Sequence, residues 1–120
     1  MSILFMQKMA KENYGLPHSI RRHLNTRPKN GKGNFSVGNN ITQLMTYFNT
    51  EKNHPESIHE YIGRVPGIKP FGRTPSGDVI GIDNKGFVVM QDHETGKLMP
   101  VNKNYKDFLR NMKAHQSKRG

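Results

Sequence analysis

The chain has 120 residues and a formal net charge of +10, from 19 Lys and Arg against 9 Asp and Glu. This length suits a single domain and excludes a multi-domain enzyme, and the absence of cysteine excludes disulfide scaffolds, thiolate nucleophiles and Cys-based metal sites. The longest apolar run near the start, residues 3–6, is too short for a membrane span or a signal peptide, so we expect a cytoplasmic protein with no membrane partner.

Two helices are predicted at the start of the chain, over residues 2–13 and from Pro17 onward. Proline favours the first turn of a helix, where its missing N–H would have no helical partner. Both segments carry apolar residues at helical spacing. These residues are Ile3, Met6 and Met9 in the first segment, and Ile20 and Leu24 in the second.

The next segments are predicted to be a loop, a short strand and a third helix. Residues 25–34 are a loop by composition, and residues 35–37 form a short strand. Asn39 or Asn40 can then cap a helix. Its apolar residues at positions i, i+3, i+4 and i+7 form the clearest helical pattern in the sequence: Ile41, Leu44, Met45 and Phe48.

A short helix and an irregular segment follow. Residues 53–62 are predicted to be helical, with Ile58, Tyr61 and Ile62 on one face. Residues 63–77 contain three prolines and four glycines, and we therefore expect them to be irregular.

The pattern changes from helices to strands after residue 78. Two apolar runs, residues 79–82 and 87–90, flank a turn that ends in Gly86, and this arrangement predicts a hairpin. A second turn leads to a strand over residues 97–101. Because Pro100 cannot donate a hydrogen bond to a neighbouring strand, we place this strand at the edge of the sheet.

A last amphipathic helix is predicted from Tyr105, Phe108, Leu109 and Met112. The order of elements indicates an α+β fold. We expect an antiparallel sheet, a three-stranded meander plus the short strand, packed with N-terminal helices and a C-terminal helix. One domain would span residues 1–112, and residues 113–120 would be a basic, flexible tail.

The charge is concentrated at the two ends of the chain. Residues 1–49 carry +6, residues 50–94 carry −2 and residues 95–120 carry +6. Clustered Lys and Arg can bind the phosphates of nucleic acid, or they can simply keep a protein in solution. We favour the second interpretation, because there is no run of five or six like charges and aromatic residues do not alternate with basic ones.

No metal or cofactor site is predicted. The six histidines form no helical His-x-x-x-His pair and no zinc-protease motif. Asp78, Asp83 and Lys85 faintly resemble the residues of metal-dependent nucleases, in which carboxylates hold the metal. Asp83 and Lys85 fall on a hairpin turn, which favours Asp and Asn for local reasons, so we expect turn chemistry here.

The triplet Asp92-His93-Glu94 is a polar cluster at the end of a predicted strand. A histidine beside two carboxylates can act as a general base. No nucleophile, oxyanion-hole motif or phosphate-binding loop accompanies it in the sequence. We therefore expect a polar strand end that shapes a loop, and we do not predict an enzyme.

The second half of the chain combines several turns and apolar runs in a recognisable order. They are Ile-Lys-Pro-Phe-Gly-Arg-Thr-Pro-Ser-Gly-Asp over residues 68–78, Val-Ile-Gly-Ile-Asp over 79–83, Gly-Phe-Val-Val over 86–89 and Asp-His-Glu over 92–94. Upstream, Leu16-Pro17 follows Glu12 and Gly15, and Asn30-Gly31 lies in the loop. Over roughly residues 3–112, this arrangement resembles the SMI1/KNR4 (SUKH) superfamily.

This resemblance implies a non-enzymatic protein-binding module. Bacterial members of that superfamily commonly act as immunity proteins, which bind a toxin such as a nuclease or a deaminase and occlude its active site. We therefore expect an immunity or inhibitor protein whose partner is a toxin or another effector. The alternatives are a basic nucleic-acid-binding accessory protein and an anti-defence protein of a phage or mobile element.

Six polar residues that we expect to be exposed are candidate contacts with a protein partner. They are Arg21, Arg22, Arg73, Asp92, His93 and Glu94. Occlusion of an active site requires an interface of ~800 Å² on each partner, which a domain of this size can supply.

Overall fold

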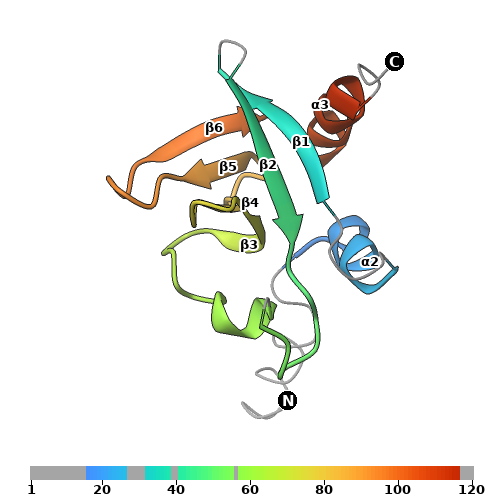
Figure 1. Ribbon diagram of the computed structural model, residues 1–120, viewed down its shortest axis with the longest axis vertical. Helices are drawn as coiled ribbons and strands as arrows, with labels where there is room; N and C mark the ends of the chain where they lie inside the picture. The colour runs from blue at the N-terminus through green and yellow to red at the C-terminus, as the bar shows by residue number, and fades with distance from the viewer. Residues whose placement is uncertain (1–15, 27–31, 39–40, 56, 117–120) are drawn as a thin grey trace.

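The computed structural model describes residues 16–26, 32–38, 41–55 and 57–116 (Figure 1). In this part of the chain there are two α-helices, α2 (His18–Thr26) and α3 (Tyr105–Gln116), and one turn of 3-10 helix, η1 (Ile58–Glu60). Together with an antiparallel sheet they make an α+β fold, which confirms the predicted fold class. The helix predicted over residues 2–13 lies outside the described residues.

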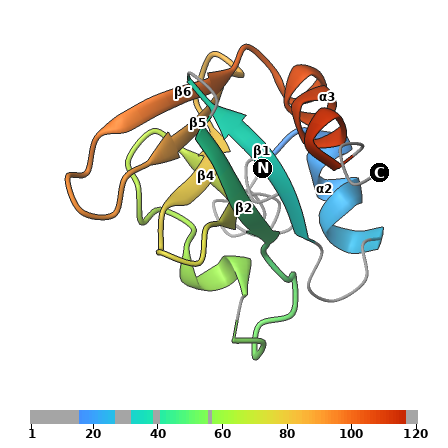
Figure 2. The same ribbon diagram turned by 45° about the horizontal axis from the view of Figure 1, so that its top comes forward.

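The sheet has six strands: β1 (Lys32–Val37), β2 (Ile41–Tyr47), β3 (Lys69–Arg73), β4 (Val79–Ile82), β5 (Val88–Gln91) and β6 (Leu98–Asn102). Each strand pairs with its neighbours along the chain, so the order is β1-β2-β3-β4-β5-β6. The sheet curls into a nearly closed barrel in which β1 comes back toward β6 (Figures 1 and 2). The predicted three-stranded meander is therefore not confirmed. Its three strands are β4, β5 and β6, which form the second half of a six-stranded meander.

Both described α-helices lie where the sequence predicts them. Leu16, Ile20 and Leu24 of the α2 segment are buried, four residues apart. The Asn104 side chain caps α3, because its Oδ1 accepts a hydrogen bond from the Asp107 N–H at 2.8 Å. The helix continues to Gln116, beyond the predicted domain end at residue 112. No helix among the described residues is long and apolar enough to cross a membrane.

The helix predicted from Ile41 to Phe48 is wrong, because this segment is strand β2. Met45 and Tyr47 point into the core, whereas Leu44 is 36% exposed, so burial alternates along the segment as in a strand. The β-branched residues of this segment favour extended backbone. A tight hairpin pairs it with β1, and Gly38 at the start of the turn has a φ of 59°, which favours glycine.

The segment predicted to be irregular, residues 63–77, contains strand β3. Its Pro70 and Gly72 are poor strand formers, and the pairing with β4 has a register shift between them. The short helix predicted over residues 53–62 is reduced to the single turn η1. Ile58 of that turn is buried, as expected, whereas Ile62 is 42% exposed.

The main core lies between the concave face of the sheet and the two helices. It is rich in aromatic residues, and its largest fully buried side chains include Phe35, Phe48, Phe71 and Phe108. A smaller cluster on the convex face consists of Val65, Ile68, Val79 and Val89. Gly81 allows the chain to pack closely on that face, because a Cβ atom there would lie 2.5 Å from the Lys69 carbonyl oxygen.

A buried chain of polar groups joins both helices to the sheet. The Tyr105 hydroxyl of α3 lies 2.6 Å from His23 Nδ1 of α2 and 2.7 Å from the Tyr47 hydroxyl of β2. The Tyr47 hydroxyl also donates to the sulfur of Met112 at 3.8 Å. These contacts satisfy hydroxyl groups that would otherwise be costly to bury.

Candidate functional site

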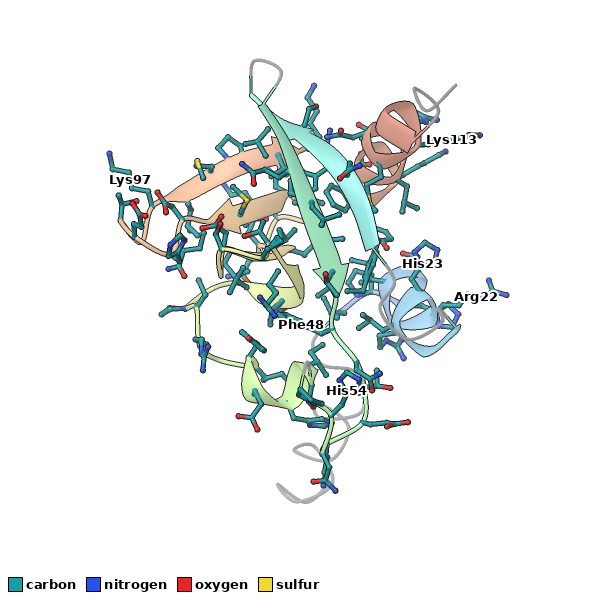
Figure 3. The ribbon with its side chains drawn as sticks, viewed as in Figure 1. Arg22, His23, Phe48, His54, Lys97 and Lys113 are labelled. Carbon is teal, nitrogen blue, oxygen red and sulfur yellow. The ribbon has the colours of Figure 1, made fainter. Side chains whose placement is uncertain are left out.

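The six predicted contact residues fall into two groups on different parts of the molecule. Arg21 and Arg22 lie on α2, whereas Arg73 ends β3 and the triplet of residues 92–94 follows β5. Figure 3 shows Arg22 on one side of the molecule and Lys97, which closes the β5–β6 turn, on the opposite side. The structure therefore brings together the second group and separates it from the two arginines of α2.

The β5–β6 turn of residues 92–97 is built by its own side chains. Asp92 Oδ1 accepts a hydrogen bond from the Glu94 N–H at 2.9 Å, and Asp92 Oδ2 accepts one from the Thr95 hydroxyl at 3.1 Å. The backbone closes the turn from Asp92 N–H to Lys97 O at 2.9 Å, and Gly96 has a φ of 76°. Asp, Thr and Gly are the residues that such a turn favours.

The β3–β4 turn of residues 74–78 is closed in a similar way. Its backbone hydrogen bonds run from Thr74 N–H to Asp78 O at 2.9 Å and from Gly77 N–H to Thr74 O at 3.0 Å. The Thr74 hydroxyl donates to Asp78 Oδ2 at 3.0 Å and accepts from the Asp78 N–H at 3.1 Å. Thr74 and Asp78 are both buried, so the carboxylate of Asp78 lies inside the protein and is shielded from water.

Asp78 and His93 join the two turns, and we call this pair the Asp78–His93 latch. Asp78 Oδ1 accepts two hydrogen bonds from His93, from the backbone N–H at 2.9 Å and from Nδ1 at 2.7 Å. Because an ionised carboxylate can only accept, the proton of this contact resides on Nδ1. The imidazole side chain is 40% exposed, and its Nε2 lies 3.7 Å from Glu94 Oε1.

The latch shifts the pKa values of both residues in the direction that keeps them charged. Burial raises the pKa of Asp78, but the hydrogen bonds from the His93 N–H, the His93 imidazole and Thr74 outweigh this effect, so the pKa lies below its ordinary 3.8. The hydrogen bond to Asp78 raises the pKa of His93 above its ordinary 6.5, against a smaller effect of desolvation. The pair is therefore ionic over a wider pH range than two isolated side chains.

The latch has one feature of a general base, but within the described residues no hydrogen bond joins His93 Nε2 to a hydroxyl group. A carboxylate on Nδ1 orients an imidazole so that Nε2 can accept a proton. The hydroxyl groups of Thr74 and Thr95 donate instead to the carboxylates of Asp78 and Asp92. Asp83, the other carboxylate of the nuclease-like pattern, accepts from the backbone N–H groups of Lys85 and Phe87, which is turn chemistry.

A metal ion is the other ligand that this cluster suggests. Candidate ligand atoms of Asp78, Asp92 and His93 all lie within 4.8 Å of one another. However, both carboxylates already accept hydrogen bonds on each of their oxygens, and His93 Nδ1 is held by Asp78. A cation would have to replace these contacts, so the cluster is complete as a structural latch.

The sequence does not show the latch directly, because Asp78 and His93 lie 15 residues apart and share no motif. The signal that could have found it is the register of the predicted hairpin. Val79 pairs with Gln91, so residues 78 and 92 must leave the same end of the β4–β5 pair. An acidic residue just before one strand and a histidine just after its partner then lie within reach of each other.

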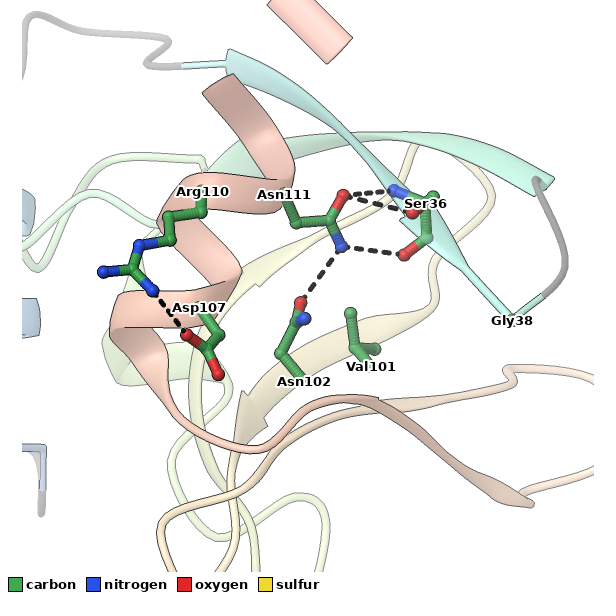
Figure 4. A pocket seen from close by; sticks show the side chains of 7 residues that line it. All are labelled: Ser36, Gly38, Val101, Asn102, Asp107, Arg110 and Asn111. Carbon is green, nitrogen blue, oxygen red and sulfur yellow. Dashed lines mark hydrogen bonds and ion pairs between the residues drawn. The ribbon is translucent and has the colours of Figure 1, made fainter. Parts of the chain in front are cut away.

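A second candidate site is a pocket of about 460 Å³ where α3 covers the gap between β1 and β6 (Figure 4). Asn111 of α3 spans this gap. It donates to the Ser36 carbonyl and to Asn102 Oδ1, both at 3.0 Å, and accepts from the Ser36 N–H at 2.8 Å. Arg110 and Asp107 line the same pocket, and none of the six predicted contact residues does.

Comparison of the chain with protein-family models, curated proteins and solved structures finds no match. The similarity to the SMI1/KNR4 superfamily is thus a prediction that rests on the residues of the sequence alone.

Proposed function

We propose that the protein is a non-enzymatic binding module that inhibits a protein partner by covering a functional surface of it. The observation that carries this proposal is the set of hydrogen bonds by which the Asp78–His93 latch joins the two turns. These turns present charged side chains on a surface whose shape is fixed before binding. Preorganised surfaces bind tightly because little conformational entropy is lost on association.

The proposed contact surface, which we call the turn platform, consists of Arg73, Asp92, His93, Glu94 and Leu98. Arg73, Val79, Gln91 and Leu98 are consecutive partners across strands β3 to β6, so Arg73 and Leu98 lie in one row across the sheet. Three strand spacings separate them, which is about 15 Å. Leu98 is 49% exposed and supplies an apolar contact beside the charged turn.

The composition of the turn platform suits a protein partner. Arginine is enriched at the energetic centres of interfaces, and a polar rim around an apolar contact is typical of them. The resemblance to immunity proteins gives the class of partner, a toxin or another effector, with nucleases and deaminases as the expected activities. The residues that carry this resemblance include Asp78 and the triplet of residues 92–94, which form or flank the latch.

The test is affinity capture with the wild-type protein and two charge-matched variants. Glu94→Lys changes the turn platform, whereas Glu60→Lys makes the same change at an exposed position of η1, away from it. We expect one effector to be captured by the wild type and by Glu60→Lys, with at least tenfold weaker binding to Glu94→Lys in a subsequent titration. The captured effector should lose its activity at one equivalent of inhibitor.

Two results would count against the proposal. Equal binding of both variants would place the interface elsewhere on the molecule. Capture of no effector, or of one whose activity is unchanged at saturation, would remove the inhibitory function itself.

A further inference from the structure

The exposed face of α3 carries a line of cations that the proposed function does not use. Lys106, Arg110 and Lys113 are spaced i, i+4 and i+7, so they lie on one side of the helix, and all three are exposed. The opposite side is buried through Tyr105, Phe108 and Met112. We call these three cations the basic stripe.

Little negative charge opposes the basic stripe on its own helix. The one carboxylate of α3 is Asp107, which lies 3.4 Å from Arg110. The side chains of this pair are 69% and 38% exposed, and such exposed pairs are weak. Lys103 precedes the helix and is exposed as well, and Arg22 of α2 and Lys113 both point outward on the same side of the molecule (Figure 3). Within α3, the three cations of the basic stripe therefore face one carboxylate, that of Asp107.

The pocket at the β1–β6 gap opens beside this stripe, and Arg110 belongs to both (Figure 4). Asn102 uses its Oδ1 to accept from Asn111, and within the described residues its Nδ2 has no hydrogen-bond partner. The lining of the pocket thus includes the amide donor of Asn102 and, on the far side of Asp107, the guanidinium of Arg110 (Figure 4). Its volume of about 460 Å³ is within the range of small-ligand sites and large enough for one nucleotide.

We propose that α3 binds single-stranded nucleic acid, with the phosphates along the basic stripe and one nucleotide in the pocket. The seven residue steps from Lys106 to Lys113 rise about 10 Å along the helix, so the three cations can contact about three successive phosphates of one strand. An unpaired nucleotide can turn its base edge toward Asn102, whereas a base inside a duplex cannot enter a pocket. This surface lies on the other side of the molecule from the turn platform. The two proposals can therefore be tested independently of each other.

The test measures the affinity of a short labelled single-stranded oligonucleotide by fluorescence anisotropy as a function of salt. With three phosphate contacts, the log–log slope should be about −2, and the affinity should fall about 20-fold between 50 and 200 mM salt. The double variant Lys106→Glu/Lys113→Glu should bind at least ~10-fold more weakly, with a slope reduced to below about 1 in magnitude.

Two controls separate this surface from net charge and from misfolding. Lys52→Glu/Lys85→Glu makes the same charge change at exposed positions away from α3 and should bind like the wild type. Asn102→Asp keeps the oxygen that accepts from Asn111 but replaces the free donor with a negative oxygen. It should weaken single-strand binding about tenfold, whereas Asn84→Asp in the exposed β4–β5 turn should not.

The proposal would be overturned by any of four results. These are no binding of the wild type at low salt, equal losses in the two double variants, equal affinity for a duplex of the same sequence, and tighter binding to anionic lipid vesicles than to the oligonucleotide. The effector-capture experiment with Glu94→Lys is independent of all four.

Discussion

Asp78 is the residue on which the geometry of the turn platform depends most. Its two oxygens accept hydrogen bonds from three different groups, the His93 N–H, the His93 imidazole and the Thr74 hydroxyl. A carboxylate with so many donors is more than a surface ion pair, because the loss of its charge leaves several polar groups without a strong partner. The same contacts fix the orientation of the imidazole that the platform presents.

This arrangement predicts a stability difference between the wild type and Asp78→Asn that depends on pH. The lowered pKa of Asp78 makes its contribution present above pH 3.8 and lost as the pH falls through the folded-state value. The raised pKa of His93 makes its contribution complete below pH 6.5 and lost as the pH rises through its folded-state value. The difference should therefore be largest between about pH 4 and 6.5, where the hydrogen bonds accepted by the buried Asp78 carboxylate contribute about 1–3 kcal/mol.

Urea denaturation at pH 3, 5.5 and 8.5 measures this difference. Asp83→Asn is a suitable control, because Asn keeps the oxygen that accepts from the backbone in that turn. A difference that does not change between pH 3 and 5.5 would show that Asp78 and His93 do not form an ionic latch in solution.

Among the elements, β2 shows how one sequence can satisfy two periodicities. Its apolar residues fit a helix at i, i+3, i+4 and i+7, and they also fit a strand in which Met45 and Tyr47 alternate with Leu44 and Thr46. Leu44 distinguishes the two structures. In a helix its side chain would lie on the buried apolar face, whereas in the strand it lies on the outer face. Its exposure of 36% identifies the strand.

Two alanine substitutions distinguish these structures experimentally. Met45 is fully buried, so Met45→Ala should lower the free energy of unfolding by about 2–5 kcal/mol. Leu44→Ala should cost less than about 1 kcal/mol, because the side chain already contacts water. Thermal or urea denaturation gives both values. Similar large costs for the two neighbours would favour the helix, in which both side chains are buried.

The elements that could be predicted are those whose local signals agree with their tertiary environment. The β4–β5 hairpin has two apolar runs and a glycine turn, and α3 has one apolar face and an Asn cap. Strand β3 could not be predicted, because Pro70 and Gly72 disfavour a strand locally. It forms because β2 and β4 on either side supply its hydrogen-bond partners, and this is information from distant parts of the chain.

Some residues of the candidate sites could be predicted from the sequence, and others could not. The sequence indicated the triplet of residues 92–94 and Arg73, which the structure places at one end of the sheet. It did not identify Asn111 or the pocket, since a polar residue beside the apolar face of a helix has no distinctive spacing. The role of Asn111 arises only from the curl of the sheet, which brings Ser36 and Asn102 to the same amide.

At the scale of the whole molecule, a side chain joins the edges of the barrel where backbone pairing stops. Asn111 serves as a short substitute for a strand, because its amide offers Ser36 one acceptor and one donor, as a neighbouring backbone would. It also reaches Asn102 of β6. The two edge strands are thereby tied to α3 and to each other.

Removal of this amide should loosen one region of the molecule and lower its overall stability. We expect Asn111→Ala to cost about 1–3 kcal/mol, because Ser36 loses partners for both of its backbone groups. The amide of Ser36 should exchange with solvent at least tenfold faster. Asn111→Asp keeps an acceptor for the Ser36 N–H and should retain more of that protection. Hydrogen exchange followed by NMR checks both, and unchanged Ser36 protection in Asn111→Ala would contradict this role for the bridge.

The strand order has a consequence for how the chain reaches this state. Every pairing in the sheet joins segments that follow each other in sequence, and all but the β2–β3 pairing, which spans residues 48–68, close a small loop. The contact between Ser36 and Asn111 instead spans 75 residues. We therefore expect the hairpins to assemble early and the barrel to close last. The same seam should then be the first part to open when the native protein fluctuates, which would expose the edges of β1 and β6 together.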